Sequence, residues 1–187
     1  MSRENDNRKG QDNFDSPIGK DDESIAVARG LRDFFLAKNR RELDEALTLL
    51  EYGAEANAEL EYEFNRLFVG PASPAAPPWA SVYLEKEPRL MGESTLFVRR
   101  LCSALGLSAP AGYPEDWAPF ELELWLILRA LREERADERL TAMSEDLIKH
   151  LDAWIPIFSG RARSASDNKS INFVITKLEE WLVKAKE

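Results

Sequence analysis

The chain has almost none of the residues from which most catalytic and metal sites are built. Its 187 residues include one cysteine and one histidine, so neither a zinc site of His and Cys ligands nor an internal disulfide can be assembled. It also lacks a P-loop, a Gly-x-Gly-x-x-Gly dinucleotide motif and a Gly-x-Ser-x-Gly nucleophile motif. We therefore expect a protein with no catalytic activity, metal or cofactor, in a reducing compartment.

Further absences narrow the class of protein. The longest apolar-rich stretch, 117–131, contains three charged residues and is too short to cross a membrane. The N-terminus lacks the apolar core of a secretory signal. Positive charge is in the minority, and the net charge of −9 disfavours a nucleic-acid binder and favours a cationic partner. These features predict a cytoplasmic protein without stable membrane insertion.

Helical periodicity is what the chain does contain. Apolar residues recur at spacings of three and four from Ser24 to the C-terminus, and no segment alternates as a strand would. The pattern predicts an all-α domain over residues 23–187, whose loop 107–116 divides two helical portions, after a disordered segment 1–22. Pro156 is expected to kink or end the helix that precedes it.

The stretch 61–107 is the most informative part of the chain. An amphipathic helix is expected to end at Gly70, because glycine suits the position after a helix and Pro71 cannot continue one. Two adjacent prolines then stiffen a loop that carries Trp79 and Tyr83. Large aromatic side chains on a rigid loop favour a binding surface, although the same pair could instead cap the core.

Four motifs resemble those of the TorD/DmsD/NarJ-like chaperones, which assist assembly of molybdenum-containing redox enzymes. They are Leu-Phe-x-Gly-Pro at 67–71, Pro-Pro-Trp-x-Ser-Val-Tyr at 77–83, Pro-Glu-Asp-Trp at 114–117 and His-Leu-x-x-Trp-x-x-x-Phe at 150–158. The resemblance covers roughly residues 25–185. One departure is clear, since Trp117 stands where the family has histidine.

The resemblance implies a TorD-like helical bundle that binds the twin-arginine signal peptide of a molybdoenzyme catalytic subunit, or its apoenzyme, and delays export until the cofactor is inserted. Relatives that exchange helices leave both a monomer and a domain-swapped dimer open. The peptide-binding residues that we assign are Leu67, Phe68, Pro78, Trp79, Ser81, Tyr83, Glu115, Asp116 and Trp117. The two carboxylates would bind arginines, and the aromatic groove would bind the apolar stretch.

Several alternatives stay open. The chain could be a chaperone or adaptor for another client without signal-peptide binding, or a helical protein that binds a small molecule such as a guanine nucleotide, although no phosphate-binding motif is present. Asp116 could also be a helix N-cap. His150 fits a structural residue better than a general base, and Glu59, Glu61 and Glu63 are interpreted as solvated.

Overall fold

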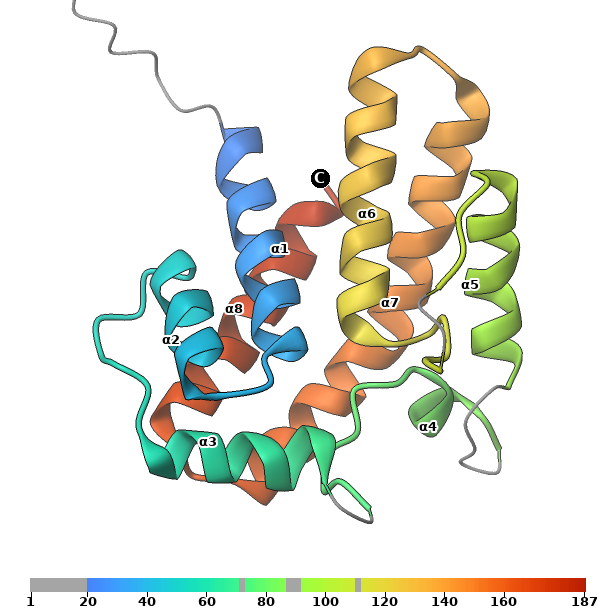
Figure 1. The fold of residues 1–187 in the computed structure, drawn as a ribbon. Coiled ribbons are helices and arrows are strands. Elements are labelled where there is room, and N and C mark those ends of the chain that lie inside the picture. Colours follow the sequence, from blue (N-terminus) through green and yellow to red (C-terminus); the bar gives the residue numbers. More distant parts are fainter. Residues whose placement is uncertain (1–19, 71–72, 87–91, 110–111) are drawn as a thin grey trace, which may run out of the picture.

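The computed structural model describes residues 20–70, 73–86, 92–109 and 112–187, and within these ranges all regular structure is helical. The expected all-α class is therefore confirmed (Figure 1). The elements are α1 Lys20–Leu36, α2 Arg40–Leu49, α3 Ala58–Phe64 with its π-helical continuation η1 Asn65–Val69, α4 Ser81–Leu84, α5 Glu93–Ala104, α6 Ala118–Glu134, α7 Glu138–Ala165 and α8 Lys169–Ala185.

Two boundaries differ from expectation. α1 begins at Lys20, before the predicted start near Ser24, and the rest of the segment expected to be disordered lies outside the described residues. α7 does not end at Pro156 but continues as a helix to Ala165. Proline has no N–H, so the carbonyl of Asp152, one turn earlier, loses its helical hydrogen bond. Asp152 and Pro156 are both exposed, so water can bond to this carbonyl instead.

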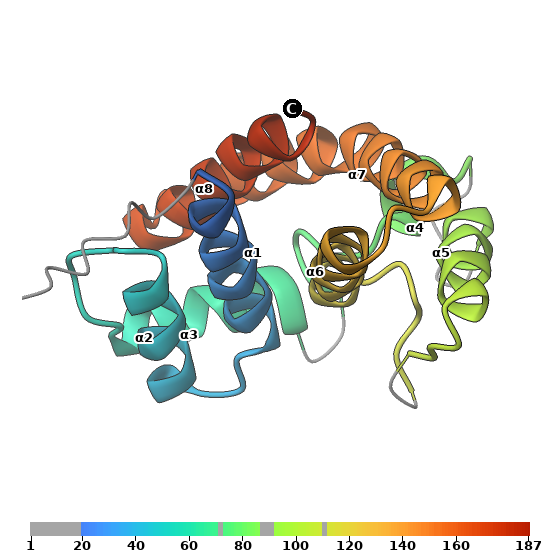
Figure 2. The same ribbon diagram turned by 90° about the horizontal axis from the view of Figure 1, so that it is seen from above.

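The helices before and after loop 107–116 pack together in one core. α1 lies against α2, α6 and α8, while α6 and α7 form an antiparallel pair. Figure 2 shows α2 and α3 at one end of the molecule and α5 at the other, with α7 and α8 along one side. The two helical portions are thus parts of a single hydrophobic cluster.

Aromatic rings fill the centre of this cluster. Phe34, Phe64 and Phe68 meet edge to face with centroids 5.3–6.4 Å apart, and Phe158 reaches the same group from α7. Such contacts add about 0.5–1.5 kcal/mol per pair beyond the burial of area. The last helix bears out the three- and four-residue spacing of the sequence, since six apolar residues along it are buried: Ile171, Val174, Ile175, Leu178, Trp181 and Leu182.

Polar residues fix where the helices begin and end. The side chains of Asn39, Asn57, Asp137 and Asn168 each accept a backbone N–H in the first turn of the helix that follows, which satisfies donors without an intrahelical partner. Gly70 ends η1 as expected, with φ 55° and ψ 150°, a backbone region that is essentially restricted to glycine.

Phe158→Ala should lower the free energy of unfolding by about 3–5 kcal/mol, because the ring is 0% exposed and its loss leaves a cavity among other aromatic rings. The neighbouring Ile157→Ala is the control, since Ile157 is 51% exposed and should change stability by less than about 1 kcal/mol. Urea unfolding of both variants measures the difference, and equal losses would contradict this account of the core.

Candidate functional site

The Pro-rich loop and the segment that leads into α6 pair with each other. Trp79 and Trp117 lie opposite one another as an isolated antiparallel bridge. Their neighbours exchange two backbone hydrogen bonds of 3.0 and 2.9 Å. We call residues 77–83 together with 112–118 the crossing. Segments far apart in sequence therefore lie side by side, next to α5 and α7, which both contact α4.

A buried carboxylate ties the crossing together. Asp116 is 0% exposed; its Oδ2 accepts the backbone N–H of Ser81 at 2.7 Å, and its Oδ1 accepts the hydroxyl of Thr95 at 2.7 Å. It thus joins the start of α4, the first turn of α5 and the entry to α6. The N-cap interpretation is wrong, because α6 begins at Ala118 and its N-cap is Trp117.

A second buried carboxylate, that of Glu121, lies in the first turn of α6. Glu121 is 0% exposed and accepts hydrogen bonds from Trp154 Nε1 at 3.0 Å and His150 Nε2 at 2.9 Å. Burial alone would lower the pKa of His150, but the charge and hydrogen bond of Glu121, with Asp116 beyond, outweigh it and raise that pKa. The imidazole of His150 also packs against the ring of Phe97, at a centroid distance of 4.9 Å.

The nine residues predicted to bind a peptide divide by exposure. Those that are buried are Leu67, Phe68, Pro78, Ser81 and Asp116, and those that are partly exposed are Trp79, Tyr83, Glu115 and Trp117. Seven of the nine belong to the crossing. The remaining two, Leu67 and Phe68, lie in the aromatic core, where a peptide could reach them only after other side chains move. Peptide contact stays a prediction, favoured for the partly exposed group.

The two acidic residues proposed to bind arginine are already engaged. Both oxygens of Glu115 accept from Arg99, at 2.6 and 3.0 Å, and this guanidinium lowers the pKa of Glu115. Asp116 is enclosed. Beside them, Trp117 stacks on Tyr113 with centroids 4.4 Å apart and planes 14° apart. The solvent-facing part of the crossing is therefore aromatic rather than anionic.

The other two aromatic residues of the crossing face inward in part. Tyr83 donates its hydroxyl to the carbonyl of Pro77 at 2.8 Å and stacks on Trp154, and burial raises its pKa. Trp79 is half-buried, and its Nε1 has no partner among the described residues. The core interpretation fits Tyr83, which packs on Trp154, while a binding role for the half-buried Trp79 stays a prediction.

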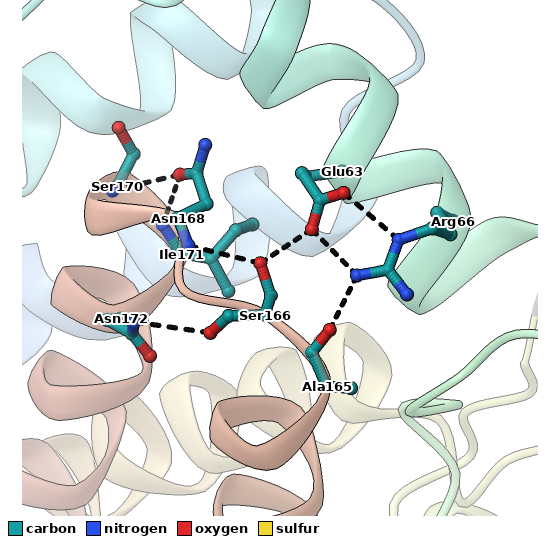
Figure 3. A network of polar contacts seen from close by, with 8 residues as sticks. All are labelled: Glu63, Arg66, Ala165, Ser166, Asn168, Ser170, Ile171 and Asn172. Carbon is teal, nitrogen blue, oxygen red and sulfur yellow. Dashed lines mark hydrogen bonds and ion pairs between the residues drawn. The ribbon is translucent and has the colours of Figure 1, made fainter.

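A polar network that the sequence did not predict joins α3 and η1 to the corner between α7 and α8 (Figure 3). Arg66 forms a two-pronged ion pair with Glu63, with distances of 3.0 and 2.7 Å, and donates to the Ala165 carbonyl at 2.6 Å. Ser166 donates to Glu63 at 2.6 Å and accepts from the amide of Asn168 at 3.2 Å. The interpretation of Glu63 as solvated is therefore wrong.

A groove with a volume of about 820 Å³ opens beside this network, between α3 and the α7–α8 corner formed by residues 164–170. Its lining includes Glu55, Glu59 and Tyr62 on one side and Asp167 on the other. The alternating carboxylates of α3 were the only sequence signal for it. Within the described ranges, no group of three or more His, Cys, Asp or Glu could hold a metal ion, and no helix is long and apolar enough to cross a membrane.

Comparison with known proteins points to one family. The model of the nitrate reductase delta subunit family matches residues 35–159. The chain is 32% identical over 111 residues to the Tat proofreading chaperone DmsD of Salmonella typhi, and 31% identical over 133 residues to the chaperone protein TorD of Vibrio cholerae serotype O1. The matches cover 57% and 67% of this chain, but only 50% and 60% of those relatives.

A solved structure supports the same fold. A protein assigned to redox enzyme maturation in Archaeoglobus fulgidus superposes with a TM-score of 0.59 at 18% identity, over 97% of this chain and 99% of that one. At this identity the likeness concerns the fold alone. The sequence relatives are named as chaperones rather than catalysts, in agreement with the expectation of a non-enzymatic protein.

Asp116→Ala should lower the free energy of unfolding by about 2–4 kcal/mol, because it leaves the amide of Ser81 and the hydroxyl of Thr95 buried without their acceptor. Glu115→Ala is the adjacent control, and loss of its more exposed ion pair should cost less than about 1 kcal/mol. Chemical denaturation gives both values. A similar loss in the two variants would show that Asp116 does not hold the crossing.

The pH dependence of stability should report the His150–Glu121 pair. Because the folded pKa of His150 is raised, its contribution is fully present below about pH 6.5 and is lost as pH rises through the folded pKa. The difference in unfolding free energy between wild type and His150→Gln should therefore be larger at about pH 5.5 than at about pH 8.5. His150 is the only histidine in the chain, so no other imidazole interferes. A pH-independent difference would contradict the pairing.

Proposed function

This chain belongs to the nitrate reductase delta subunit family, the redox enzyme maturation chaperones that include DmsD and TorD, and from that premise we propose that it is a cytoplasmic chaperone for a molybdenum-cofactor enzyme. In this proposal it binds the twin-arginine signal peptide of the catalytic subunit and holds the subunit back from export until the cofactor is inserted. The family match over residues 35–159 is the observation that carries the proposal.

The crossing supplies the surface for the apolar part of the peptide. Trp79 and Trp117 are partly exposed there and Tyr113 is exposed, and the bridge and the Asp116 hydrogen bonds hold the backbone of the two tryptophans. Rings held by a rigid backbone give contact area with little loss of conformational entropy on binding. The whole crossing lies within the segment 35–159 that matches the family model. This supports the proposal that the crossing serves a function shared with the relatives.

Because of Trp117, the pH dependence of peptide binding should differ from that of relatives with histidine at that position. An indole does not titrate near neutral pH, so binding should depend little on pH between about 5.5 and 7.5. The indole instead adds a large apolar face, already stacked on Tyr113. We therefore assign Trp117 to the apolar stretch of the peptide rather than to its arginines.

The wild-type protein should bind a synthetic peptide that carries two adjacent arginines followed by an apolar segment. Trp117→Ala should weaken binding by roughly thirtyfold, equivalent to about 2 kcal/mol, as expected for an aromatic anchor. Leu49→Ala serves as the control, since this exposed residue lies on α2, away from the crossing. Isothermal titration calorimetry measures each affinity. No binding by the wild-type protein would refute the proposed function, and unchanged binding by folded Trp117→Ala would exclude this part of the crossing.

A further inference from the structure

The crossing offers an aromatic surface but no available carboxylate for a cationic peptide end. Asp116 is enclosed, and Glu115 is occupied by Arg99. Moving two guanidinium groups out of water costs free energy unless anionic acceptors replace the hydrogen bonds to water. If the ligand carries paired arginines, their partners must therefore lie elsewhere on the molecule.

The groove between α3 and the α7–α8 corner has such partners. Glu55, Glu59 and Asp167 line it, all three are exposed, and none forms an ion pair or side-chain hydrogen bond among the described residues. Two cations also line the groove, but Arg66 already donates to Glu63 through Nε and Nη2, and to the Ala165 carbonyl through Nη2, as Figure 3 shows. With Lys169 as the remaining cation, the unpaired side chains of the groove are predominantly acidic.

An anionic ligand fits the same groove less well. The N-terminus of α8 borders it, and helix N-termini attract anions. However, Asn168 Oδ1 already accepts from the amides of Ser170 and Ile171, at 3.0 and 3.2 Å. The donors that would hold a phosphate are thus occupied, while the carboxylates opposite would repel it.

The geometry also suits arginine better than lysine. Tyr62, on the rim, is 67% exposed, so its ring can stack with a guanidinium plane. A guanidinium presents donors in a planar fork that pairs with carboxylates in two-pronged fashion, which an ammonium cannot do. A volume of about 820 Å³ is in the range of sites that hold a drug-sized molecule, and so has room for a short peptide segment.

The groove is continuous with the loop that leads to the crossing. Arg66 and Ala165 are among the residues that line the groove. The carbonyl of Arg66 accepts the amide of Ala75 at 3.1 Å, and Arg161 donates to the Ala75 carbonyl at 2.6 Å. From Ala75 the chain runs through the buried residues 76–78 to the half-buried Trp79. A peptide that leaves the groove beside Arg66 would therefore meet the exposed and partly exposed residues 73–75 before the crossing.

Exposed apolar side chains accompany this path. Val69 on η1 is 52% exposed, Ile157 on α7 is 51% exposed, and Leu84 on α4 is 37% exposed. These three elements border the loop, since η1 precedes it, α4 follows it and α7 packs against α4. An acidic groove that adjoins exposed apolar side chains suits a peptide in which paired arginines are adjacent to an apolar stretch.

We propose that the groove between α3 and the α7–α8 corner binds the paired arginines of the client peptide through Glu55, Glu59 and Asp167, while the apolar stretch continues over residues 73–79 to the crossing. This inference rests on the proposed function, because it assumes a peptide with adjacent arginines. It separates the charged and apolar contacts into two surfaces that can be altered independently.

The test compares two triple variants with the same change of charge. The groove variant is Glu55→Gln, Glu59→Gln and Asp167→Asn. The control is Glu134→Gln, Asp137→Asn and Glu138→Gln, on the turn between α6 and α7 at the opposite end of the molecule (Figure 1). Asparagine keeps the N-cap at position 137. The probes are three peptides that share one apolar segment and begin with Arg-Arg, Lys-Lys or Gln-Gln.

Wild type and the control variant should bind the Arg-Arg peptide roughly tenfold or more tightly than the Gln-Gln peptide, with Lys-Lys between them. The groove variant should lose most of this preference and much of the salt dependence, while its affinity for the Gln-Gln peptide stays unchanged.

A groove variant that keeps the Arg-Arg preference would overturn the inference and leave the proposed function intact. Equal losses in both triple variants would also overturn it, because they would indicate overall charge. Failure of the wild type to bind any of the peptides would refute both.

Discussion

The arrangement of the crossing depends on the burial of one carboxylate. Asp116 has no contact with solvent, and its two oxygens accept from α4 and α5 at the point where the chain enters α6. A buried charge is costly unless its acceptors are satisfied and a counter-charge lies near. The first condition is met, because both oxygens accept hydrogen bonds of 2.7 Å, and Asp116 in turn is one of the charges that raise the pKa of His150. The residues of the crossing are therefore positioned by these hydrogen bonds as well as by apolar packing.

This constraint decides which acidic residues can serve in recognition. A carboxylate that holds three segments together cannot also release its hydrogen bonds to a ligand without loosening the fold. The same holds for Glu63, whose oxygens are shared by Arg66 and Ser166. Structural carboxylates thus occupy the interior and the base of the groove, whereas Glu55, Glu59 and Asp167 keep their hydration and can exchange it for guanidinium. The proposed site uses the second group.

Local patterns predicted the fold well and the polar contacts poorly. The apolar stripe on α8 and the end of η1 at Gly70 follow from periodicity and backbone preference, which act over a few residues. By contrast, the donors to Asp116 lie 21 and 35 residues away in the sequence, and Glu63 accepts from Ser166 over a separation of 103 residues. No sequence window contains such pairs. Asp116 beside a helix start therefore suggested an N-cap, and the groove, which forms only when α3 meets the α7–α8 corner, was not predicted.

The central claim is that the groove binds the arginines of the peptide and the crossing binds its apolar stretch. Hydrogen–deuterium exchange of the full chain, alone and with the Arg-Arg peptide, tests this claim most directly. Amides protected by a bound peptide exchange more slowly, so a peptide that spans the groove and the crossing should slow exchange at both surfaces. The account predicts added protection in 54–66 and 164–170 together with 73–83 and 112–118, and no change at the α6–α7 turn. Protection confined to the crossing, with the groove unchanged, would contradict it.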